Sequence, residues 1–77
     1  MTGQFIYRTG KMIGALGALI VTLKSVSNPS RKAIDSVYKN IVDIRLAMMN
    51  FPADYQDTID SINADLDELV KEINLLG

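Results

Sequence analysis

The run from Met12 to Leu23 contains no charged side chain, and a lysine closes it at each end, Lys11 and Lys24. A helix needs about 20 predominantly apolar residues to cross a bilayer, whereas runs of about 10 to 14 are more typical of core or interfacial helices. The length of this run places it in the second class. The surface that covers it therefore constrains both the fold and the kind of function.

The chain has 77 residues, no cysteine and no histidine. That length allows one domain with a small core, and such domains commonly depend on disulfides, a metal or association for stability. Without cysteine or histidine, the chain cannot form a disulfide, a zinc site of thiolate or imidazole ligands, or a Cys or His catalytic group. Association with another surface is the stabilising device that remains.

Positive and negative charges are separated along the chain. Residues 1–34 contain five basic side chains and no acid, and all nine acids lie between Asp35 and Glu72. This asymmetry has two explanations. Either the basic half binds an anionic surface, or the first segment lies beside the acidic last segment of the same chain.

Two prolines divide the chain into helical segments. Asn28 is a favourable helix N-cap with proline at the first helical position, and Pro52 begins a further segment in the same way. Strand-like alternation of apolar and polar residues is absent from the sequence. We therefore predict an all-α fold with helices over 4–26, 30–49 and 52–75. A hydrophobic, basic N-terminal helix (residues 1–27) precedes an amphipathic antiparallel helical hairpin (residues 28–77).

The second and third segments carry the heptad spacing of coiled-coil seams. The third has a narrow seam with polar side chains elsewhere, so we expect it to lie against one neighbour. The second has an additional apolar flank, and a wide apolar arc predicts two neighbours. These are either the first and third helices, or the third helix and a second copy of the chain. That flank consists of Tyr38, Val42, Leu46 and Met49. The predicted hairpin seam consists of Ile34, Val37, Ile41, Ile44, Met48, Ile59, Ile62, Leu66, Leu69 and Ile73.

The first segment separates large, small and charged side chains on different helical faces. Glycine in a helix interior costs about 1 kcal/mol relative to alanine, so these glycines need compensation from packing. Small residues at helical spacing let two backbones approach closely. We predict a self-association ridge of Gly10, Gly14, Gly17 and Ala18. The predicted membrane or assembly contacts are Phe5, Ile13, Leu16, Leu19, Ile20 and Leu23, flanked by Arg8, Lys11 and Lys24.

The three flanking cations have more than one interpretation. They fit lipid headgroups at the edge of an interfacial helix, or they are solvated, or they pair with the acidic third segment. Arg8 and Lys11 before an apolar run also fit the start of a signal peptide. Lys24 stands where a neutral cleavage region is required, so we expect the segment to be retained.

Arg45 falls inside the apolar arc of the second segment. A buried arginine requires an acidic partner, because an unpaired buried charge costs several kcal/mol. One hypothesis is an ion pair that sets specificity at an interface, with an aspartate of the third segment or of a neighbouring chain. The other, which we favour, is a side chain whose stem covers apolar surface while its charge reaches solvent.

The remaining motifs point away from catalysis. The aspartates of the third segment lack the spacing and loop glycine of a calcium-binding loop, and three short helices leave little room for an enclosed acid–base site. The basic residues alternate with apolar ones, without a recognition helix or a stacking platform for nucleic acid. We predict no enzyme activity, no catalytic residues, no metal, no cofactor, no nucleic-acid partner and no small-molecule substrate.

The sequence favours a structural or assembly protein. It predicts association with itself as a homo-oligomer, or with a larger complex, at a membrane and through the N-terminal helix and the heptad seams. A virion component or an accessory subunit of a membrane complex fits that description. The alternative is a small cytoplasmic three-helix adaptor or inhibitor that binds one target protein. In the alternative, Leu16, Leu19 and Leu23 contact the hairpin while Arg8 and Lys11 face solvent.

Overall fold

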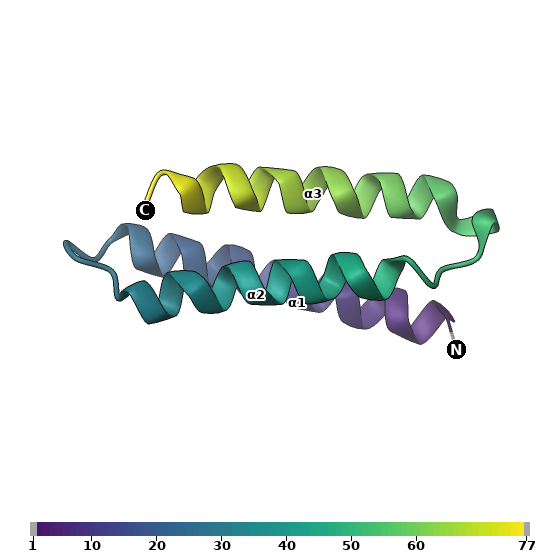
Figure 1. Cartoon of the computed structure of the whole chain (residues 1–77), viewed down its shortest axis with the longest axis horizontal. Helices are drawn as coiled ribbons and strands as arrows, with labels where there is room; N and C mark the ends of the chain where they lie inside the picture. Colours follow the sequence, from purple (N-terminus) through teal and green to yellow (C-terminus); the bar gives the residue numbers. More distant parts are fainter. Residues whose placement is uncertain (1, 77) are drawn as a thin grey trace.

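The computed structural model describes residues 2–76, and within them it has three α-helices. They are α1 (Thr2–Lys24), α2 (Arg31–Met48) and α3 (Gln56–Asn74), with a short 3-10 helix, η1 (Ala53–Tyr55), before α3. Each helix runs antiparallel to the preceding one, so the chain forms an up-down-up bundle (Figure 1). The bundle is elongated, with principal extents of 43 × 18 × 16 Å. The predicted all-α fold is confirmed, and a hydrophobic N-terminal helix precedes an antiparallel hairpin.

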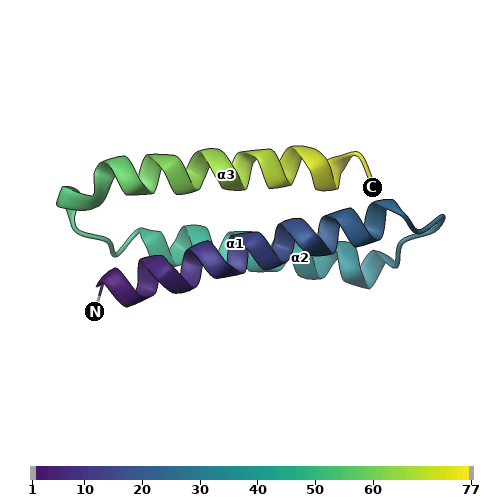
Figure 2. The same ribbon diagram turned by 180° about the vertical axis from the view of Figure 1, so that it is seen from behind.

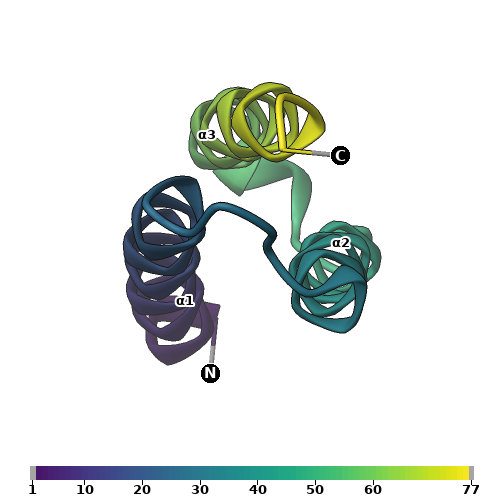
Figure 3. The ribbon, with the colours of Figure 1, turned by 90° about the vertical axis from the view of Figure 1, so that its left-hand side faces the viewer.

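The three helices form a triangle in cross-section (Figure 3). α3 packs extensively against both α1 and α2, whereas direct contacts between α1 and α2 are few. Viewed from behind, α1 crosses α2 at an angle instead of lying along it (Figure 2). The buried hydrophobic residues form one core, comprising Leu16, Ile20, Leu23, Ile34, Val37, Ile41, Ile44, Met48, Ile62, Leu66 and Ile73.

The predicted hairpin seam supplies most of this core. Eight of its ten residues are buried, and the other two, Ile59 and Leu69, are half-buried. The expectation that the third helix lies against one neighbour was wrong, however. The narrow seam of α3 contacts both α1 and α2. The wider arc of α2 packs mainly on α3, so part of its apolar flank remains in solvent.

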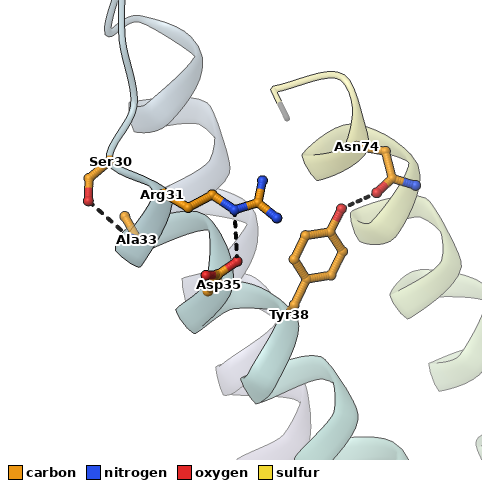
Figure 4. A network of polar contacts seen from close by, with 6 residues as sticks. All are labelled: Ser30, Arg31, Ala33, Asp35, Tyr38 and Asn74. Atoms are coloured by element: carbon orange, nitrogen blue, oxygen red, sulfur yellow. Dashed lines mark hydrogen bonds and ion pairs between the residues drawn. The ribbon is translucent and has the colours of Figure 1, made fainter.

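The start of α2 differs from the prediction. Asn28 was expected to cap the helix, but the cap is Ser30, whose hydroxyl accepts a hydrogen bond from the Ala33 amide at 3.4 Å (Figure 4). Two polar residues flank Pro29, and either can serve as a cap. Ser30, the later of the two, accepts from a backbone N–H of the first turn that would otherwise lack a partner. Arg31 then pairs with Asp35 one turn later at 3.3 Å.

The joint between α2 and α3 also differs in detail. Pro52 was expected at the first position of the third helix, but it precedes the 3-10 turn of η1, and α3 begins at Gln56. The 3-10 turn reverses the chain so that α3 can pack antiparallel to α2. At the opposite end of the hairpin, the Tyr38 hydroxyl donates a hydrogen bond to the Asn74 side-chain oxygen (Figure 4).

Candidate interaction surface

One face of α1 is packed inside the bundle. Leu16, Ile20 and Leu23 belong to the common core, and Ile13 packs partly against it. Thr9 lies on the same face, where its hydroxyl donates a hydrogen bond to the Phe5 carbonyl at 2.8 Å. The apolar run of α1 is therefore covered in part by its own chain.

A second flank of α1 lies along α3. The Lys24 ammonium pairs with the Glu72 carboxylate, and a Cβ atom on Gly17 would lie 3.8 Å from the Leu69 side chain. Nearer the start of α1, an open groove separates the helices, lined by Ile6, Gly10, Ile13, Asp57, Thr58, Ser61, Ile62 and Asp65. Internal charge complementarity thus accounts for Lys24. Arg8 and Lys11 are exposed and form no ion pair within the described residues, and Lys11 lies over the Tyr7 ring.

The opposite flank of α1, away from α3, carries a line of large hydrophobic residues. They follow a seven-residue spacing along α1 and the turn after it, and each is between 37% and 47% exposed. At the start of this line, the Phe5 ring packs edge-on against the Phe51 ring beyond α2, with the ring centroids 5.3 Å apart. We call this line the α1 stripe; it consists of Phe5, Met12, Leu19 and Val26. Arg8 lies three residues after Phe5 and four before Met12, so a cation borders the stripe.

Between Met12 and Leu23, the outward face of α1 is uncharged and open. Ala18 and Val21 are exposed there, one turn apart. A Cβ atom placed on Gly10 or Gly14 would meet no other atom within 4 Å. Of the predicted self-association ridge, only Gly17 is used for packing within the chain. The ridge remains a prediction for contacts with another surface.

By length and composition alone, α1 is the one helix in the described part of the chain that is able to cross a membrane. Core helices of soluble proteins and signal sequences share these properties. Here, 22% of the most apolar stretch of α1 is buried in the bundle. Most of α1 is therefore neither charged nor covered.

Arg45 lies at the junction of α2 and α3. Its guanidinium donates hydrogen bonds to the Asn63 side-chain oxygen at 2.8 Å and to the Asp67 carboxylate at 2.5 Å. The guanidinium reaches the surface, where the Asp67 side chain is largely exposed. The side chain thus combines parts of both interpretations. Its charge lies at the rim, as favoured, and it pairs with an aspartate of α3, as the first hypothesis expected. A role of this pair in specificity stays a prediction.

We expect Asp67→Asn to lower the free energy of unfolding by less than about 1 kcal/mol, because exposed ion pairs are screened by solvent. Asn63 still accepts from Arg45 in this variant. Urea denaturation of the variant beside wild type measures the difference. A loss of several kcal/mol would show instead that the Arg45 charge depends on Asp67.

A second exposed apolar surface lies on α2. Val42, Leu46 and Met49 lie one turn apart and are between 52% and 79% exposed. We call these three residues the α2 patch. Their spacing was predicted to meet a second neighbour, either the first helix or another copy of the chain. The first helix does not cover them, and contact with another copy stays a prediction.

The described residues contain no cluster of three or more acidic side chains able to hold a metal ion. Comparison with protein-family models, with curated proteins and with solved structures finds no match. The function therefore has to be inferred from the chemistry of these surfaces, of which the α1 stripe, the outward face of α1 and the α2 patch are the largest.

Proposed function

We propose that this protein is a non-enzymatic structural component that associates with itself or with a larger complex, at a membrane surface, through α1. The observation that carries the proposal is the outward surface of α1 between Met12 and Leu23. It faces solvent in the single chain and contains no charge.

α3 and the first half of α2 show what a solvated face looks like in this bundle. The outward side of α3 carries Asp57, Glu68 and Lys71, and the first half of α2 carries Lys32 and Lys39. A helix at the surface of a soluble bundle normally has charged and polar residues opposite its buried stripe. Between Met12 and Leu23, α1 has alanine, glycine, valine and leucine there and a single hydroxyl, Thr22, which is the composition of a helix that another surface covers.

The shape of the single chain supports the same proposal. Its accessible surface is 5222 Å², whereas a compact monomer of this mass exposes about 4,700 Å². Its radius of gyration is 13.2 Å, against about 11.5 Å for a typical domain of this length. The excess surface is what an associating subunit leaves open until it meets its partner.

One observation favours the second candidate, a soluble three-helix adaptor or inhibitor. Leu16 and Leu23 are buried against the same chain while Arg8 and Lys11 face solvent, which is the arrangement expected of that alternative. Leu19, the third leucine of that test, remains 37% exposed. The adaptor binds one target, whereas the assembly protein associates without one.

A pair of matched variants tests the proposal. Ala15 on α1 and Ala64 on α3 are both exposed alanines inside helices, so glutamate at either position leaves the core intact. We expect Ala15→Glu to abolish self-association, measured by light scattering, or flotation with anionic vesicles, while Ala64→Glu behaves as wild type. The charge acts because an unpaired carboxylate in a covered apolar surface costs several kcal/mol.

The outcomes separate the two candidates. Wild-type protein that stays monomeric at high concentration and never floats with vesicles would exclude the assembly function and leave the adaptor. Equal effects of Ala15→Glu and Ala64→Glu would show that α1 is not the surface used.

A further inference from the structure

Two apolar surfaces on different sides of one bundle carry opposite charges at their edges. The α1 stripe lies on the flank of α1 away from α3, because Gly17 and Lys24 on the opposite flank meet Leu69 and Glu72. The α2 patch lies beside α3 instead, because Arg45, which runs between Val42 and Met49, bonds to that helix. One chain cannot bring these two surfaces together.

The edge of the α1 stripe is basic. Arg8 lies between Phe5 and Met12 on the helix surface, and Lys11 follows one turn after Arg8. Both cations are exposed and form no ion pair within the described residues. No acid occurs anywhere in α1.

Acids outnumber cations at the edge of the α2 patch. Asp43 lies one turn before Leu46 on α2, and Asp67 reaches the patch through Arg45, whose charge it pairs. Lys39, one turn before Val42, adds a second cation. Asp60 lies three residues before Asn63 and seven before Asp67, so all three share one face of α3. Because Asn63 and Asp67 on that face bond to Arg45, Asp60 borders the patch too. Asp43 and Asp60 are exposed.

We propose that the α1 stripe of one copy of this chain docks on the α2 patch of a second copy. This proposal rests on the proposed assembly function and names its partner. Stripe-to-stripe pairing offers no carboxylate to Arg8 and Lys11, because α1 contains no acid. Patch-to-patch pairing leaves both cations without a partner. Stripe-to-patch pairing joins apolar surface to apolar surface and cations to carboxylates, and complementary charges select that register.

Docking between two different surfaces has a structural consequence. Each added copy leaves one stripe and one patch free, so association continues until a ring closes or a filament grows. The sequence is basic in its first half and acidic in its second. Attraction between these halves of successive copies then sets the head-to-tail order.

A mixing experiment tests the docking directly. Ala15→Glu places an acid beside Met12 and Leu19 in the α1 stripe, and Leu46→Glu places one inside the α2 patch. Both positions are exposed, so both variants keep the core, which circular dichroism and thermal melting check. Met49→Glu is a second patch variant, more exposed still than Leu46→Glu.

In sedimentation velocity we expect wild type to associate beyond a dimer, and each variant alone to associate at least about tenfold more weakly. An equimolar mixture of a stripe variant with a patch variant forms one 1:1 dimer, because one intact stripe meets one intact patch. Ala64→Glu, changed on neither surface, behaves as wild type.

A mixture that stays monomeric while wild type associates would overturn the docking, because an intact stripe would then fail to bind an intact patch. A stripe variant or a patch variant that associates alone as tightly as wild type would also overturn it, because the interface would then use one surface twice. Wild type that floats with anionic vesicles but does not self-associate would also overturn it, and would leave the proposed assembly function at a membrane standing. Wild type that neither floats nor associates would remove both.

Discussion

Leu66→Ala is expected to lower the free energy of unfolding by about 2 to 5 kcal/mol, the usual cost of a cavity left by a buried leucine. Leu66 is fully buried, at 0% exposure, in the middle of the helix that packs against both others. Its loss therefore weakens both helix interfaces at once. A domain of this length has about 4 to 12 kcal/mol of total stability, so the variant is close to unfolding.

Urea denaturation followed by circular dichroism measures this change. Leu75→Ala is the matched control, because Leu75 is 76% exposed just beyond the end of the same helix. Its effect is expected to stay within about 0.5 kcal/mol. Equal midpoints for the two variants would show that the α3 seam is not the centre of the core.

Replacing both Gly10 and Gly14 with alanine is expected to stabilise the protein, in contrast to Leu66→Ala. The double variant should raise the free energy of unfolding of the single bundle by about 2 kcal/mol, because each glycine in a helix interior costs about 1 kcal/mol relative to alanine. The added methyl groups meet no atom within 4 Å, so nothing in the single chain opposes the gain.

The same variant probes why the glycines are there. If the outward face of α1 packs against another helix, alanine at these positions holds the two backbones apart and weakens association. Gly3→Ala, also in open space but in the first turn, is the control and should change either property less. A double variant that is less stable than wild type in urea would contradict the open environment of Gly10 and Gly14.

The spacing of apolar residues predicted which side chains share a face, because that depends on helical period alone. It located the seam from Ile34 to Ile73 and the apolar faces of α1. Period does not say which neighbour a face meets. α3, with the narrow seam, was expected to contact one neighbour, and it contacts two. α2, with the widest arc, was expected to meet either both other helices or α3 and a second copy of the chain, and its patch is exposed in the single chain.

The other differences arise where several nearby residues are able to fill the same role. Ser27, Asn28 and Ser30 are all able to cap a helix beside Pro29, and the packing of α2 on α3 selects among them. The partner of Arg45 was similarly open among the aspartates of α3, and the antiparallel register brings Asp67 beside it. The outward direction of Gly10 and Gly14 required knowing how α1 leans on the hairpin.

Alkylation of single cysteines tests the central claim most directly, since the natural chain has no cysteine. Ala15→Cys reports on the uncharged surface of α1, and Ala64→Cys reports on the charged surface of α3. On raising the protein concentration or adding anionic vesicles, we expect maleimide labelling at position 15 to slow about tenfold once nine-tenths of the protein is bound. Labelling at position 64 should keep its rate. Equal, unchanged rates at both positions under all these conditions would contradict the claim that another surface covers α1.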